Sequence, residues 1–191
     1  MVHMSSIKLT SDDRKTCLQV ARNSIQYGLL NGEKRDVVTN DYSVDLQQIA
    51  ASFVTLHKAD KLRGCIGALE GYQPLINDVA EHAYAAAFQD PRFPALEEHE
   101  FDLLKIDISI IGAAEKILFN SEEDLLRQIR PGVDGLILEF GYRRGTFLPS
   151  VWEQLADKKE FLNHLKEKAG LPKNWWDNGV KISRYETFSF A

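Results

Sequence analysis

The segment Leu62–Gly67, Leu-Arg-Gly-Cys-Ile-Gly, holds the residues of this chain best suited to chemistry. On a strand, Arg63 and Cys65 point to the same side, roughly 7 Å apart along the chain. A guanidinium near a thiol favours the thiolate, which is the nucleophilic and metal-binding form. Gly64 and Gly67 carry no side chains, so a ligand or a second backbone can approach closely. The pattern indicates a reactive thiol at Cys65 activated by Arg63, in competition with a small, buried hydrophobic cysteine.

Two more polar groups are candidates for binding a substrate. Asp90 follows a predicted helix end and can fix Arg92, whose guanidinium would then grip a carboxylate or phosphate. The competing interpretation is an Asp/Arg pair that only braces a loop. Thr146 follows the pair Arg143 and Arg144 on a predicted tight turn and can hydrogen-bond near a cleft, although two turn arginines are more often solvated.

The strand before the hexapeptide, Phe53–Lys58, is expected to form a hairpin with it. A three-residue loop, Ala59–Lys61, keeps the apolar side chains of both strands on one face, whereas a two-residue loop would separate them. We therefore predict the longer loop. The other face would then carry two cross-strand pairs, Thr55 with Cys65 and His57 with Arg63.

The rest of the chain has the periodicity of ordinary helices and strands. Predicted helices begin at Thr10 or Ser11 and at Pro74, and further ones lie over Ser121–Ile129, Val151–Leu155 and Lys159–Ala169. Predicted strands lie over Ile106–Ile110, Gly135–Phe140, Thr146–Leu148 and Lys181–Phe188, and a loop over Gly141–Gly145. The hairpin signals favour antiparallel pairing, so we predict an α+β fold. Residues 97–100, Glu-Glu-His-Glu, are interpreted as a solvated acidic turn.

Composition excludes several classes of protein. The 191 residues, 44% of them hydrophobic, suit one domain or one domain with two lobes. A net charge of -5 argues against a dedicated DNA-binding domain. Cys17 and Cys65 alone make no disulfide framework and favour a reducing, cytoplasmic setting. No stretch approaches the roughly 20 apolar residues of a membrane span, and the first six residues contain no signal-like apolar run. The five histidines show no metal-ligand spacing, so no metal site is expected.

Six motifs, in order, resemble the AMMECR domain family, over nearly the whole chain from Ile7 to Phe188. They are Phe53–Leu56, Leu62–Gly67, Ala86–Phe88 with Asp90, Arg92 and Phe93, Gly132–Leu136, Thr146–Pro149, and Leu165 with Lys168–Leu171. The resemblance implies a single α+β domain over residues 1–191, mainly antiparallel sheet flanked by helices. It also implies two unequal lobes and a cleft near the hexapeptide.

The resemblance does not imply one reaction, since an enzymatic role and a link to nucleic acid have both been suggested for the family. Bacterial and archaeal relatives are associated with Memo-like and radical SAM proteins, which hints at shared chemistry. Two departures stand out. Ser150–Leu155 replaces a longer acidic segment, and His164 or Leu165 stands where relatives often carry a cysteine. A two-cysteine mechanism is therefore not expected.

The leading hypothesis is a cytoplasmic enzyme or enzyme component, with Cys65 as nucleophile or tethering thiol and Arg63 as activator. The predicted substrate-binding residues are Thr55, His57, Gly64, Gly67, Asp90, Arg92 and Thr146. The alternative is a non-catalytic module that binds an anionic ligand, RNA or a partner protein along a groove lined by Arg63, Arg92, Arg143 and Arg144. Gly64–Gly67 also matches the G-x-x-G of KH modules, but its apolar middle pair argues against RNA. A third hypothesis is a scaffold subunit whose glycines serve only packing. The residues indicate no particular cofactor.

Overall fold

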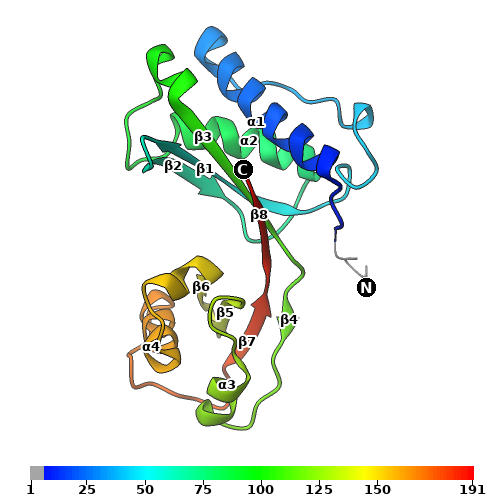
Figure 1. The fold of residues 1–191 in the computed structure, drawn as a ribbon. Helices are drawn as coiled ribbons and strands as arrows, with labels where there is room; N and C mark the ends of the chain where they lie inside the picture. Colours follow the sequence, from blue (N-terminus) through cyan, green and yellow to red (C-terminus); the bar gives the residue numbers. More distant parts are fainter. Residues whose placement is uncertain (1–6) are drawn as a thin grey trace. The chain divides into compact units, whose positions relative to one another are not determined.

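The computed structural model describes residues 7–191, which divide into two compact units (Figure 1). The first unit holds the described residues up to Gly112 together with Phe188–Ala191, and the second is Ala113–Thr187. Each contains helices and a four-stranded sheet, so the α+β prediction is confirmed. The first six residues, on which the argument about a signal sequence rested, lie outside the described part.

The first helix, α1 (Ser11–Asn31), begins and ends at the predicted signals. The hydroxyl oxygen of Thr10 accepts the backbone N–H of Asp13 at 3.1 Å, and the Asp13 carboxylate accepts the backbone N–H of Thr10 at 2.9 Å. This capping box satisfies two N–H groups that the first helical turn leaves free. Gly32, at φ +75°, ends the helix in the left-handed conformation.

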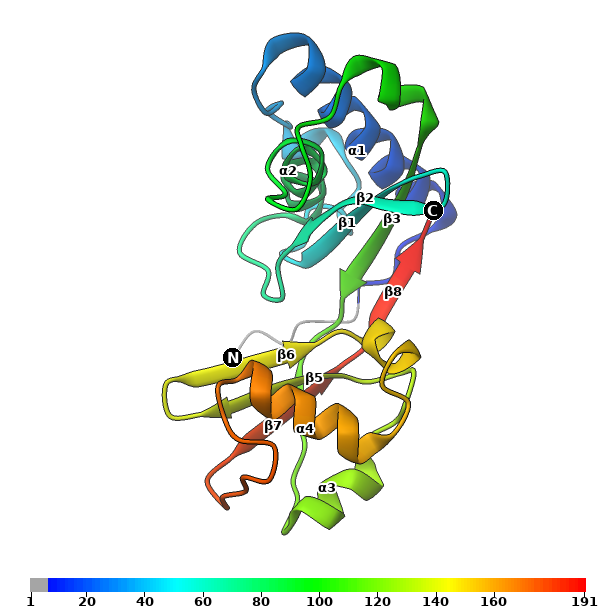
Figure 2. The same ribbon diagram turned by 90° about the vertical axis from the view of Figure 1, so that its left-hand side faces the viewer.

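The first unit is a sheet covered on one face by two helices. Its strand order is β2-β1-β3-β8, with the bounds β1 Ala51–Lys58, β2 Lys61–Gly67, β3 Leu104–Ile111 and β8 Thr187–Phe190. Helices α1 and α2 (Leu75–Phe88) pack on this sheet (Figures 1 and 2). Alternate side chains such as Val54 and Ile108 are fully buried in that core. Their neighbours, which include Thr55, point to the opposite face and are half-exposed.

The β1–β2 hairpin corrects the predicted loop. Only Ala59 and Asp60 form the turn, with φ of +50° and +59°, which are the two positive values of a type I′ turn. A β-bulge at Arg63 adds one residue to β2, so Ile66 keeps the predicted position opposite Val54, whereas Leu62 lies on the other face and is exposed. The bulge also places His57 opposite Leu62, so the predicted pairing of His57 with Arg63 was wrong.

The second unit has its own sheet, of order β4-β7-β5-β6, and its own core. The strands are β4 Glu115–Lys116, β5 Gly135–Phe140, β6 Arg143–Phe147 and β7 Lys181–Tyr185, and the helices are α3 Glu122–Gln128 and α4 Lys158–Lys168. At the centre of this core the Trp152 ring stacks on Phe161, with 3.6 Å between the centroids. Most strands and helices lie where the sequence predicted them.

Three predictions about single elements were wrong in detail, two of them in the second unit and one in the first. The β5–β6 turn is only two residues, so Arg143 and Arg144 lie on a strand rather than in a five-residue loop. The predicted strand Lys181–Phe188 is two strands, β7 and β8, which belong to different sheets. The acidic segment after Glu97 is a short 3-10 helix, η2 (Glu98–Leu103). Within the described residues, no helix combines the length and apolar character needed to cross a membrane.

Candidate functional site around Cys65

The Cys65 thiol is half-buried on the polar face of the first sheet, as we call the side facing away from α1 and α2. Thr55 lies directly opposite on β1, as predicted, and its Oγ1 donates a hydrogen bond to Cys65 Sγ at 3.2 Å. The other thiol, Cys17, is completely buried in α1, and burial, together with the charge of Asp13, raises its pKa to about 12. Cys65 is therefore the thiol that solvent and reagents can reach.

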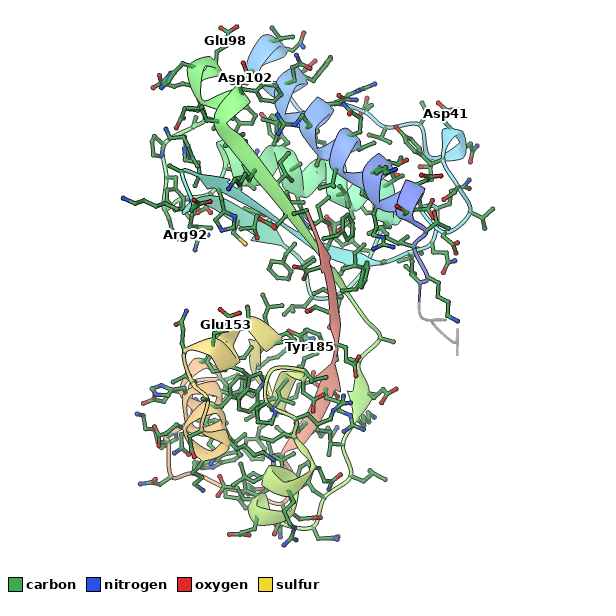
Figure 3. All side chains as sticks on the ribbon, viewed as in Figure 1. Asp41, Arg92, Glu98, Asp102, Glu153 and Tyr185 are labelled. Atoms are coloured by element: carbon green, nitrogen blue, oxygen red, sulfur yellow. The ribbon has the colours of Figure 1, made fainter. Side chains whose placement is uncertain are left out.

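The main chain of Cys65 is held by the Asp90–Arg92 pair. Its N–H donates to Asp90 Oδ2 at 2.8 Å, and its carbonyl accepts from Arg92 Nη2 at 3.2 Å. Arg92 Nε and Nη2 also donate to the two oxygens of Asp90, at 2.9 and 2.7 Å. Asp90 is buried two residues after α2 ends, whereas the Arg92 side chain is half-exposed (Figure 3). Both interpretations of this pair are thus present: it braces a loop, and it presents a cation beside the thiol.

Asp90 and Arg92 each hold the other in its charged form. The Arg92 guanidinium holds the pKa of Asp90 well below its usual range, against the opposing effect of burial, and the Cys65 N–H adds to this. The Asp90 carboxylate raises the pKa of Arg92 in return, and the Cys65 side chain contributes to that rise. Arg92 is therefore a permanent cation that interacts with the Cys65 side chain.

Arg63 has a different partner from the one predicted. Its Nε and Nη2 donate to the two carboxylate oxygens of Glu100 in η2, at 3.0 and 2.8 Å, and no hydrogen bond to Cys65 is present in the described chain. Both side chains are buried, and Lys58 binds the same carboxylate. These bonds, first of all those from Arg63, hold the pKa of Glu100 well below its usual range although burial opposes them. The interpretation of residues 97–100 as a solvated acidic turn was therefore wrong for Glu100, which is buried.

A histidine–carboxylate pair lies on the same polar face. His57 Nδ1 is 2.9 Å from Asp107 Oδ2, and each side chain is more than half buried. Asp107 is opposite Thr55 on β3, so that Cys65, Thr55 and Asp107 form one row across three strands. His57 lies two residues further along β1, in the next row. Hence the strands β2, β1 and β3 together place a thiol, a hydroxyl, an imidazole and a carboxylate on one face.

The hexapeptide glycines allow close packing. A Cβ on Gly64 would lie 2.0 Å from the carbonyl oxygen of Ala86, so α2 crosses the backbone of β2 at that point. A Cβ on Gly67 would lie 2.3 Å from the Phe53 ring. The sequence predicted that these glycines allow a ligand or a second backbone to approach closely. At Gly64 it is a second backbone, that of α2, that approaches.

Thr146 lies on β6 in the second unit. Its hydroxyl donates to the Leu136 carbonyl at 3.0 Å and lies 3.3 Å from the Tyr185 hydroxyl (Tyr185 is labelled in Figure 3). These bonds give Thr146 a role within the β5–β6 hairpin. Of the predicted substrate-binding side chains, the structure brings Thr55, His57, Asp90 and Arg92 close to Cys65. The hydrogen-bond partners of Thr146 are instead Leu136 and Tyr185.

Comparison with known proteins identifies the family. The AMMECR1 family model matches residues 18–190. The chain belongs to the AMMECR1 family. Protein MJ0810 of Methanocaldococcus jannaschii is 40% identical over 95% of this chain and 91% of its own length, and a protein of Methanothermobacter thermautotrophicus is 36% identical over 98% of both. The crystal structure of the uncharacterised protein PH0010 from Pyrococcus horikoshii is similar, with a TM-score of 0.80 and 32% identity over 91% of this chain and 88% of that one.

In this AMMECR1 chain, sequence reasoning missed two residues of the site, Glu100 and Asp107. Asp107 alternates with buried isoleucines, so its exposure on a strand was visible, but its position beside Thr55 depends on the long-range β1–β3 pairing. Glu100 stands among other acidic residues, and nothing local indicates that Arg63 binds it. Among residues 7–191, no three His, Cys, Asp or Glu side chains are grouped so as to hold a metal ion.

Proposed function

We propose that this AMMECR1 protein is a thiol-dependent enzyme or enzyme component in which Cys65 is the nucleophile. The supporting observation is that the side chain and both backbone groups of Cys65 are hydrogen-bonded. Thr55 donates to the sulfur, Asp90 accepts the N–H, and Arg92 donates to the carbonyl. A hydroxyl donor and a nearby guanidinium both favour the thiolate. A half-buried thiol whose backbone is fixed by a charged pair is also well oriented for attack.

The surrounding residues suit distinct tasks in this proposal. The thiolate of Cys65 attacks an electrophilic carbon of the substrate, so that the S–C bond forms and the leaving group departs with its bonding electrons. Arg92, which is half-exposed, is available to an anionic group of the substrate as well as to the sulfur. Arg63 supports the site indirectly, because its guanidinium fastens β2 to η2 through Glu100. A reducing, cytoplasmic compartment would keep the thiol free.

The alternative of an arginine-lined groove for RNA or another anion has less support. Arg63 is buried against Glu100, so it cannot line a surface groove. Arg143 and Arg144 lie on β6 in the second unit, where Arg143 donates to the Gly170 carbonyl and Arg144 faces Glu139. Of the four arginines considered for this groove, Arg92 alone keeps an exposed guanidinium beside the hexapeptide.

Iodoacetamide alkylation of the folded protein tests the proposal. Cys65 should react at pH 7 faster than N-acetylcysteine, while Cys17 stays unmodified, since its raised pKa alone lowers its thiolate fraction roughly 1,000-fold. Replacement of Arg92 by Gln should slow the reaction of Cys65 by about three- to fivefold, the effect of one exposed ion pair. Peptide mass mapping after timed quenching gives the rate of each cysteine separately.

The matched control is Arg127→Gln, which removes an exposed arginine of the second unit that pairs with Asp124. It should leave the alkylation rate of Cys65 unchanged. If Cys65 is inert in the folded wild-type protein, or reacts no faster than N-acetylcysteine, Cys65 is not a nucleophile and the proposal fails. Equal slowing by Arg92→Gln and Arg127→Gln would show that Arg92 has no specific effect on the thiol.

A further inference from the structure

His57 has the surroundings of a proton-transfer group. Its Nδ1 faces the Asp107 carboxylate at 2.9 Å, which favours a proton on Nδ1 and leaves Nε2 as the second, exchangeable position. The two side chains keep 32% and 42% of their surface exposed, so the ring is held in place but is still accessible. A carboxylate that fixes the ring through one nitrogen is the arrangement by which proteins orient an imidazole for acid–base work.

The position of His57 relative to Cys65 sets what it can act on. Thr55 pairs with Cys65, and His57 is two residues further along β1 on the same face, so His57 and Cys65 are diagonal neighbours. Diagonal neighbours on an antiparallel sheet are roughly 7–8 Å apart, and their Cβ atoms are somewhat closer. This distance leaves room for a reacting group of the substrate between the sulfur and the imidazole.

We infer that His57, positioned by Asp107, is the general acid–base for acyl transfer at Cys65. The inference rests on the proposed function and deepens it by naming the reaction class. The Cys65 thiolate attacks a carbonyl carbon, the S–C bond forms, and the bond to the leaving group breaks. The leaving group takes the bonding electrons and the proton of His57 Nε2. Water or another acceptor then gives its proton to His57 and attacks the thioester, which restores the thiolate.

Charged groups from each neighbouring element surround His57. Asp107 and Lys105 come from β3, with Lys105 directly opposite His57. Asp60, in the β1–β2 turn, binds the Lys105 ammonium at 2.7 Å. On β2 the residue opposite His57 is the uncharged Leu62. Lys105 and Asp60 bind each other, so Asp107 is the charged group that contacts the ring and fixes its direction.

Three electrophiles that differ in their leaving groups test this role. Iodoacetamide and p-nitrophenyl acetate expel groups that need no proton, whereas phenyl acetate expels a basic phenolate that does. In His57→Asn the alkylation and p-nitrophenyl acetate rates at Cys65 should change less than threefold, while acylation by phenyl acetate should fall about 100-fold. The acid–base limb of the pH profile for phenyl acetate should disappear in His57→Asn. Asp107→Asn should lower the phenyl acetate rate selectively, because the ring loses the carboxylate that orients it.

Variants and controls separate catalysis from structure. His57→Gln is the second variant in case His57→Asn unfolds, and His99→Asn is the matched control because that imidazole is 70% exposed on η2. His99→Asn should leave all three rates unchanged. Equal losses with all three electrophiles in both His57 variants would mean a merely structural role and would overturn the inference.

The same data distinguish the two proposals. If wild-type Cys65 reacts with none of the three electrophiles, the proposed function fails and the inference with it. If Cys65 reacts rapidly and selectively but the phenyl acetate rate is the same in His57→Asn, the nucleophile stands and the acid–base role of His57 is refuted.

Discussion

Addition of one methyl group at Gly64 should destabilise the first unit more than any other glycine change of similar size. The new Cβ would lie 2.0 Å from the Ala86 carbonyl oxygen and 3.0 Å from the Ala86 carbonyl carbon. Because ordinary contact begins near 3.4 Å, the backbones of α2 and β2 would have to separate by about 1.4 Å. Neither backbone has a flexible end that can yield.

The cost follows from the core that α2 shares with the sheet. Overpacking of a well-packed core costs about 1–3 kcal/mol, and a clash between two backbones belongs at the upper end, so we expect Gly64→Ala to lose about 3 kcal/mol. The matched control is Gly32→Ala, where the new Cβ meets nothing within 4 Å but φ is +75°. That strain should cost only about 1 kcal/mol.

Urea unfolding followed by far-ultraviolet circular dichroism measures both changes, with an unchanged slope as the check on two-state behaviour. A second readout reaches the site, because Asp90 follows the end of α2 and accepts the Cys65 N–H. Retreat of α2 should therefore change the iodoacetamide rate of Cys65 in Gly64→Ala but not in Gly32→Ala. A loss for Gly64→Ala no larger than that for Gly32→Ala would refute the close backbone contact and the reasoning built on it.

Three further changes test individual contacts. Glu100→Gln should cost about 3 kcal/mol at pH 7 because it leaves Arg63 buried without its counter-charge. Since the pKa of Glu100 is depressed in the folded protein, this contribution to stability is present above about pH 4 and is lost as the pH falls further. A difference in urea midpoints that does not change with pH would contradict this prediction. Thr55→Val should slow alkylation of Cys65 about fivefold through the lost hydrogen bond, and an unchanged rate would count against thiolate stabilisation. Asp157→Ala should cost about 1 kcal/mol by removing the acceptor of two N–H groups at the start of α4, whereas Asp157→Asn should nearly retain wild-type stability in the same urea assay.

Local signals were sufficient for most helices and for the pairing of Thr55 with Cys65. The capping box at Thr10 is a contact between neighbours in sequence, so it could be predicted from residue types alone. The pairing of Thr55 with Cys65 was right although the loop was wrong. The predicted loop was one residue too long and the bulge at Arg63 was missed, and these two errors cancel in the register beyond the bulge.

Contacts between distant segments were beyond sequence reasoning. The bulge is tied to the bond between Arg63 and Glu100, 37 residues apart, and no local pattern indicates which acidic residue of a cluster becomes buried. The contact between His57 and Asp107 can be predicted only if the order of the strands in the sheet is known. The periodicity of β3 does not indicate that order. The sequence predicted Arg63 as the cation beside the thiol, whereas in the structure Arg63 binds Glu100 and Arg92 lies beside Cys65. Both contacts join segments that are distant in the sequence.

The strand order of the first unit has a consequence for protein synthesis. The second unit, Ala113–Thr187, lies in the chain between β3 and β8, although these two strands are neighbours in one sheet. On the ribosome, β3 therefore emerges some 75 residues before β8 can pair with it, at roughly 5–20 residues per second. During that interval the edge of β3 is unpaired, which is a hazard for aggregation. Because β7 ends at Tyr185 and β8 begins at Thr187, both sheets receive their last strand at the same final stage of synthesis.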